Sequence, residues 1–127
     1  MQFQYSILYV PDVAKSLAFY EAAFGFKTRF LHESGGFGEL DTGATTLAFC
    51  SLELLHTLGK TPGRPDPQRP SCEIAFTTRD VAHALAQALG AGARLLQPAE
   101  DMAWGQTTAY VADPDGFVIE LCTPMAG

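Results

Sequence analysis

The first half of the chain has hydrophobic and polar positions that predict one strand, one helix and three further strands. Residues 3–10 are an aromatic and β-branched run typical of a strand, which Pro11 ends. Asp12 is placed to cap a helix over 13–24, where apolar residues recur at helical spacing before Gly25. Glycine-containing turns separate three short predicted strands, at 26–33, 37–40 and 45–52. The predicted order is β-α-β-β-β.

The second half repeats this order. Residues 72–78 predict a strand, and Asp80 is placed to cap a helix whose core face is Val81, Leu85 and Leu89. Further strands are predicted at 93–97 and within 104–121. Asp80 lies 68 positions after Asp12, and the same offset carries Tyr5 onto Glu73. Aligning Gly43 with Gly116 brings Phe37 onto Tyr110 and Leu47 onto Glu120. An internal repeat of this size indicates two copies of one supersecondary unit.

The stretch 104–121 predicts a hairpin. Asp113-Pro114-Asp115-Gly116 suits a type I turn with glycine in a positive-φ bulge. In that register Tyr110 lies opposite Glu120, so a phenol and a carboxylate share one face of the sheet. The alternative for Glu120 is a solvent-side position on a half-buried strand.

Between the halves, residues 53–71 are rich in proline and glycine, which prevent a continuous helix or ladder. The chain is therefore predicted to be a single domain, 1–127, with module one at 3–52, a linker at 53–71 and module two at 72–124. The linker is interpreted as a surface arm, with a ligand lid as the alternative.

Composition narrows the class of protein. A chain of 127 residues fits one domain, and 47% hydrophobic residues with no apolar run near membrane-spanning length exclude a membrane protein. The N-terminus lacks a basic signal-peptide region, so a cytoplasmic location is expected. A net charge of −6 without a basic cluster argues against nucleic acid. Cys50, Cys72 and Cys122 are expected to be buried free thiols.

The segments VPDVAKSLAFYEAAFGF and TAYVADPDGFVIEL, within the tandem order, resemble the vicinal oxygen chelate superfamily, which includes glyoxalases, bleomycin-resistance proteins and extradiol dioxygenases. The resemblance covers essentially the whole chain. It implies an α+β fold in which tandem βαβββ modules form a curved mixed sheet around a cup, and it implies a homodimer. Enzymes of this superfamily hold a divalent metal ion in the cup.

In this sequence the superfamily's metal-ligand positions correspond to Tyr5, Leu47, Glu73 and Glu120. Catalytic divalent sites typically use three or more His or carboxylate ligands. Leu47 offers no lone pair, a shift of one residue offers Thr46 or Ala48, and a neutral phenol such as Tyr5 is a poor ligand. No metal cofactor is therefore expected; an ion, if present, would be bound by Glu73 and Glu120.

The function expected first is that of a metal-free small-molecule binding protein, similar to bleomycin-resistance proteins, which sequesters a planar aromatic or cationic ligand. Bound ligand should quench the fluorescence of Trp104. The alternatives are a metal-dependent lyase, isomerase or dioxygenase of the glyoxalase type, a carboxylate pair that transfers protons, and a scaffold whose cup is filled by its own side chains. The predicted ligand-binding residues, from strand parity and position, are Tyr5, Phe37, Phe49, Glu73, Trp104, Tyr110 and Glu120.

Overall fold

A computed structural model describes residues 1–125. The chain divides into two compact units, residues 1–63 and residues from 64 onward. The boundary between the units lies inside the Pro/Gly-rich segment 53–71.

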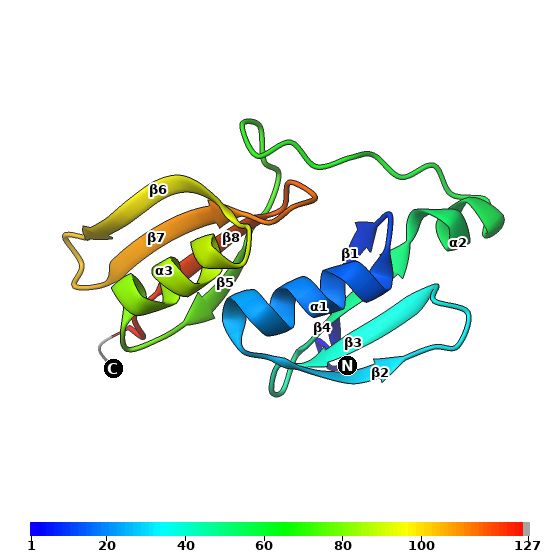
Figure 1. Cartoon of the computed structure of the whole chain (residues 1–127), viewed down its shortest axis with the longest axis horizontal. Helices are drawn as coiled ribbons and strands as arrows, with labels where there is room; N and C mark the ends of the chain where they lie inside the picture. The colour runs from blue at the N-terminus through cyan, green and yellow to red at the C-terminus, as the bar shows by residue number, and fades with distance from the viewer. Residues whose placement is uncertain (126–127) are drawn as a thin grey trace. The chain divides into compact units, whose positions relative to one another are not determined.

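The first unit contains one four-stranded mixed sheet with the order β1-β4-β3-β2 (Figure 1). Strands β1 and β4 pair in parallel, and the other neighbours are antiparallel. The elements of this unit are β1 Tyr5–Val10, α1 Val13–Phe24, β2 Lys27–Leu31, β3 Phe37–Asp41, β4 Thr46–Ser51 and α2 Leu52–Thr57.

Local sequence fixes both ends of α1. The Asp12 side chain accepts a hydrogen bond from the Lys15 backbone N–H, and Gly25 adopts φ 79°, the left-handed conformation that ends many helices. The buried face of the helix carries Val13, Leu17 and Tyr20. The Tyr20 ring packs on Phe49 of β4, with ring centroids 5.1 Å apart.

The second unit has the same architecture, with the sheet order β5-β8-β7-β6 and a parallel β5–β8 pair. Its elements are β5 Ile74–Thr77, α3 Val81–Gly90, β6 Arg94–Asp101, β7 Thr107–Ala112 and β8 Val118–Cys122. Asp80 caps α3 by accepting a hydrogen bond from the His83 backbone N–H. The predicted α+β class and the repeated βαβββ order are confirmed.

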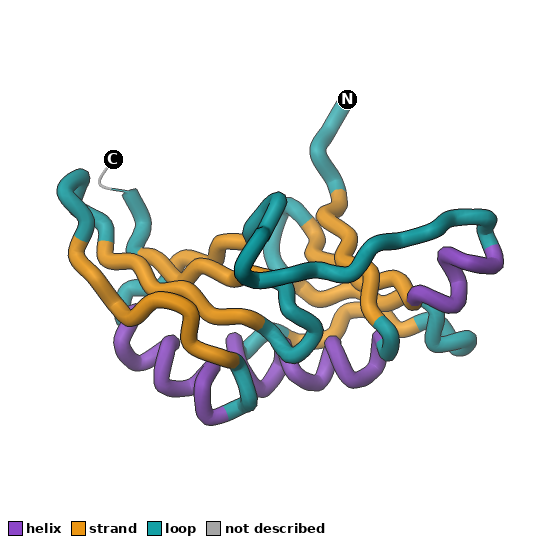
Figure 2. Tube along the Cα trace, turned by 90° about the horizontal axis from the view of Figure 1, so that it is seen from above, coloured by secondary structure: helices purple, strands orange, loops and turns teal. Residues whose placement is uncertain are grey.

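In each unit the long helix, α1 or α3, lies along one face of its sheet, as Figure 2 shows for the helices in purple and the strands in orange. We call the opposite face of each sheet the open face. The open face of the first unit leaves Tyr5, Ile7 and Tyr9 of β1 exposed. No helix in residues 1–125 has the length and apolar character needed to span a membrane.

The predicted orientation of β4 is wrong. Parallel pairing aligns Tyr5 with Thr46 and Ile7 with Ala48, so Thr46 and Ala48 share the open face with β1, whereas Leu47 and Phe49 point toward α1. The turn before β4 has four residues, 42–45, and the turn before β8 has five, 113–117. Aligning Gly43 with Gly116 therefore shifted the strand after the turn by one residue and reversed its faces.

Three smaller expectations are also corrected. The sequence did not predict α2, which starts where Ser51 accepts a hydrogen bond from the Leu54 backbone N–H. Cys72 is exposed, whereas Cys50 and Cys122 are buried, and all three are free thiols. On α3, Ala88 is fully buried and Leu89 is exposed, because the helix turns Ala88 toward the sheet.

Candidate functional site

The phenol of Tyr110 and the carboxylate of Glu120 face each other across β7 and β8. Tyr110 pairs with Glu120 in the antiparallel register, as predicted, and its hydroxyl donates a hydrogen bond to Glu120 Oε2 at 2.9 Å. Both side chains are half-buried on the open face of the second sheet. One carboxylate oxygen of Glu120 is therefore held by the phenol, and the orientation of the carboxylate is fixed.

The turn that joins these strands sets this register. The backbone N–H of Asp113 donates to the Phe117 carbonyl, and Gly116 adopts φ 102°, which accommodates the bulge. Asp113 is buried, and its Oδ1 accepts hydrogen bonds from the backbone N–H groups of Asp115 and Phe117. A buried carboxylate thus stabilises the turn, and two residue pairs of the β7–β8 ladder separate the turn from the Tyr110–Glu120 pair.

Glu73 joins this pair from the residue before β5. Glu73 lies close enough to Glu120 for the two carboxyl groups to interact through charge, and for a hydrogen bond between them when Glu73 is protonated. It also lines a pocket of about 440 Å³ together with Tyr110. The remaining walls of the pocket come from Pro67, Pro70, Leu96, Gln97 and Val118. An acidic group and a phenol therefore lie beside apolar surface in one cavity of the second unit.

Charge and burial favour the protonated forms around the pocket. Partial burial of its carboxyl group raises the pKa of Glu73, and the charge of Glu120 and the hydrogen bond with Glu120 raise it further, although much of the Glu73 residue is exposed. Burial, followed by the hydrogen bond to Glu120 and nearby negative charges, raises the pKa of Tyr110 to about 12. Burial and then the two glutamates also raise the pKa of the Cys122 thiol. A hydrogen bond between two carboxyl groups requires one proton, and the raised pKa of Glu73 means that Glu73 can supply it.

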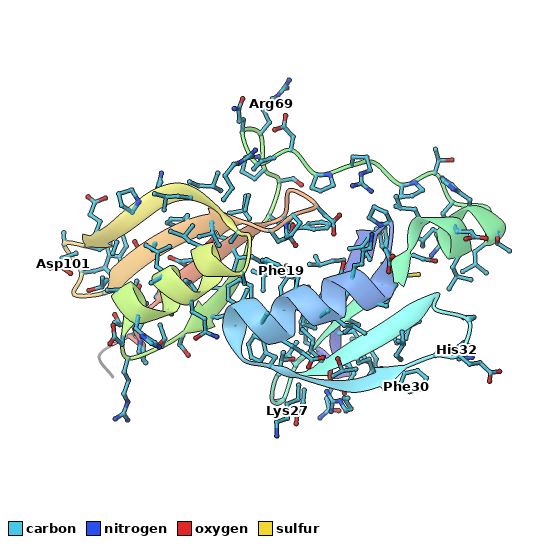
Figure 3. All side chains as sticks on the ribbon, in the orientation of Figure 1. Phe19, Lys27, Phe30, His32, Arg69 and Asp101 are labelled. Atoms are coloured by element: carbon cyan, nitrogen blue, oxygen red, sulfur yellow. The ribbon has the colours of Figure 1, made fainter. Side chains whose placement is uncertain are left out.

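Trp104 does not line this pocket. It lies in the turn between β6 and β7, its side chain is 61% exposed, and its Nε1–H donates to Gln106 Oε1 at 2.8 Å. Figure 3 labels Asp101 at the end of β6, next to this turn. Residues 106 to 110 alone span roughly 13 Å of extended strand, so the ring is remote from Tyr110. Trp104, one of the predicted ligand-binding residues, therefore lies outside this pocket, because it belongs to the β6–β7 turn and not to the β7–β8 hairpin.

The other predicted residues belong to the first unit. Tyr5 and Phe37 lie on its open face, because their partners Thr46 and Cys50 share one face of β4. Phe49 is fully buried against Tyr20 on the opposite face and is a core residue. His32, which Figure 3 shows near the β2–β3 turn, is exposed and hydrogen-bonds Ser34 through Nδ1. Within this unit the structure therefore supports an open-face position for Tyr5 and Phe37.

Sequence reasoning missed four lining residues of the pocket, whereas strand parity places the fifth, Val118, on the same face as Tyr110. Pro67 and Pro70 fall in the predicted linker, where the cluster of prolines just before β5 is the available signal. Leu96 and Gln97 required the pairing of β6 with β7, in which Gln97 lies opposite Tyr110. Thr108, on the same face of β7 as Tyr110, buries a hydroxyl that has no hydrogen-bond partner among the described residues.

The donor set does not fit the divalent metal that the resemblance implied. Glu73 and Glu120 are adjacent, but no group of three or more His, Cys, Asp or Glu side chains able to hold a metal ion occurs within residues 1–125. The corrected register places Ala48 where the second unit has Glu120, because Ile7 pairs with Ala48 as Ala75 pairs with Glu120. Neither Ala48 nor Leu47 has a side-chain atom that can bind a metal ion.

The family model described as Glyoxalase/Bleomycin resistance protein/Dioxygenase superfamily matches residues 2–121. The chain belongs to this superfamily. The match spans both units and includes the α1 segment and the closing hairpin. No match was found among curated proteins.

Several solved structures share the fold of this chain. A glyoxalase-related enzyme from Fulvimarina pelagi is 27% identical, with a TM-score of 0.83 over 98% of this chain and 88% of that one. A protein of unknown function from Agrobacterium tumefaciens is 30% identical, with a TM-score of 0.78, 98% coverage of this chain and 94% of that one. A family enzyme from Burkholderia phytofirmans, 22% identical, has a TM-score of 0.80 over 97% and 98% of the two chains. These similarities leave the activity open.

Proposed function

We propose that this protein binds a small organic cation with a flat apolar part, without a metal ion, in the pocket of the second unit. The observation that carries the proposal is Glu73, which lines a cavity with proline, leucine and valine walls and interacts with Glu120, whose carboxylate accepts a hydrogen bond from Tyr110. Carboxylates attract a cation, and the apolar walls offer surface to a ring.

The raised pKa of Glu73 gives this mode of binding a measurable signature. A bound cation favours the ionised form of Glu73. Ligand binding should therefore release a proton at a pH near the raised pKa of Glu73. In this respect the site differs from one in which a bound metal ion contacts the ligand, where chelation of the ion would weaken binding.

The first test is titration with proflavine, a planar tricyclic cation, after exhaustive treatment with a chelator. Glu73→Gln should weaken binding about tenfold or more, because it removes a charge-assisted contact. The matched control is Glu100→Gln, which removes the same charge from an exposed position on β6 outside the pocket. Its effect should be small because exposed charges are screened.

Calorimetry at a series of pH values above the ordinary pKa of a glutamate, 4.5, in two buffers that differ in ionisation enthalpy, should show that binding releases a proton in the wild type and not in Glu73→Gln. Equal affinities of the wild type and Glu73→Gln, or binding that disappears with the chelator and returns with a divalent metal, would refute the proposal. The second result would favour the metal-dependent enzyme.

A further inference from the structure

The segment from residue 64 to residue 70, which we call the arm, packs on the β7–β8 turn. A Cβ atom at Gly116 would lie 3.2 Å from the Pro65 carbonyl oxygen and 3.4 Å from Pro67 Cδ. The arm therefore packs so closely on the turn that a side chain at residue 116 would crowd it. The positive φ of Gly116 independently favours glycine, so the turn and the arm both use the same residue.

Additional contacts give the arm a defined shape. Arg64 Nη2 lies 3.9 Å from Asp115 Oδ1 at the other side of the turn glycine. Within the arm, the backbone N–H groups of Gln68 and Arg69 donate to the side chain and the carbonyl of Asp66. Figure 3 shows the Arg69 side chain extending outward from the arm. The ion pair is long and partly exposed and contributes little, whereas the packing of Pro65 and Pro67 on Gly116 is close.

The arm contributes two prolines to the pocket. Pro67 and Pro70 line it together with Glu73, Tyr110 and the sheet residues Leu96 and Val118. Proline rings are rigid, so they present apolar surface to a ligand without losing side-chain rotamer freedom on binding. The pocket therefore has an acidic end and a rigid apolar wall that come from adjacent parts of the sequence.

We propose that the arm determines ligand specificity: Pro67 and Pro70 contact the flat apolar part of the ligand, while Glu73 binds its cationic group. This inference rests on the proposed function and adds the residues that select the ring. The ligand class it implies is a ringed organic cation in preference to a ringless one.

The experiment compares two probes on three proline variants and on Glu73→Gln. Proflavine affinity is measured directly, and the affinity of n-propylammonium, a ringless cation, is measured by competition with proflavine. Pro67→Ala and Pro70→Ala should each weaken proflavine about three- to tenfold, the loss expected for one or two methylene contacts, and leave n-propylammonium unchanged. Pro62→Ala is the matched control, since Pro62 precedes the arm and does not line this pocket.

The outcomes distinguish a failure of the proposed function from a failure of the proposed role of the arm. Absence of proflavine binding to the wild type refutes the proposed function. Wild-type binding that Glu73→Gln weakens, but that Pro67→Ala and Pro70→Ala affect no more than Pro62→Ala does, refutes the role of the arm alone. Equal weakening of both probes by the two proline variants also refutes it, because the arm would then act by supporting Glu73.

Discussion

Tyr110 should ionise near pH 12, later than an ordinary tyrosine. Its pKa rises from 10.0 to about 12 because the ring is partly buried, its hydroxyl donates to Glu120, and Glu120, Glu73 and the Cys122 thiolate place negative charge nearby. At about 1.4 kcal/mol per pH unit, the neutral phenol is favoured over the phenolate by about 3 kcal/mol more than in an unfolded chain.

The consequence for folding has a definite sign. A pKa that is higher in the folded state means that the folded chain binds the proton more tightly. The stability this confers is fully present below pH 10 and is lost as the pH rises through about 12. The free energy of unfolding should therefore fall by up to about 3 kcal/mol across this window, and Tyr110→Phe should lack this decrease.

The assay is the near-ultraviolet absorbance of tyrosinate in a pH titration. The difference between the wild type and Tyr110→Phe isolates one of the four tyrosines. Glu120→Gln should move the midpoint of Tyr110 down toward 10 without reaching it, since the amide removes the charge while the burial remains. A wild-type midpoint near 10, or one that Glu120→Gln leaves unchanged, would refute the geometry of the Tyr110–Glu120 pair.

Three further predictions concern stability. Gly38→Ala should destabilise the protein by about 1–3 kcal/mol in a urea titration, because the new Cβ atom would lie 2.8 Å from Leu17 and 2.9 Å from Val13, which are both buried. Gly63→Ala is the control, because Gly63 has open space around it, and equal effects of the two substitutions would contradict this packing. As the pH rises from 4.5 through the raised pKa of Glu73, the wild type should lose stability relative to Glu73→Gln, and parallel curves would contradict the coupling of Glu73 to Glu120. Asp113→Ala should lower the free energy of unfolding by about 1–3 kcal/mol in thermal or urea unfolding. Asp113→Asn should lower it less, because asparagine keeps an oxygen that accepts from the two backbone N–H groups of the turn, and equal decreases for the two variants would exclude this role.

The sequence was sufficient where local chemistry determines structure. Asp12 and Asp80 cap the helices as predicted, and the Asp113–Gly116 turn sets Tyr110 opposite Glu120. The sequence was insufficient where the structure depends on the exact number of residues in a turn. A turn one residue shorter before β4 reversed the faces of Leu47 and Phe49, and no local signal distinguishes the two registers of an apolar strand.

The candidate site could be predicted only in part, for the same reason. The two glutamates and Tyr110 follow from strand parity, but the contribution of Pro67 and Pro70 depends on how the arm folds back on Gly116. That contact is tertiary and leaves no periodic pattern in the sequence. Trp104 shows the opposite case: it is close to Tyr110 in sequence, but it lies in the β6–β7 turn and does not line the pocket.

The parallel strand pairs have a consequence for how the chain folds. In each unit the first strand pairs with the last, as Tyr5 does with Thr46 and Ile74 with Ile119, roughly 40 residues later, so these pairs carry a loop-closure entropy that the hairpins do not. Hairpin formation should precede closure of each sheet. Because the first unit completes its sheet by residue 51, it can close on the ribosome while the second is still being synthesised.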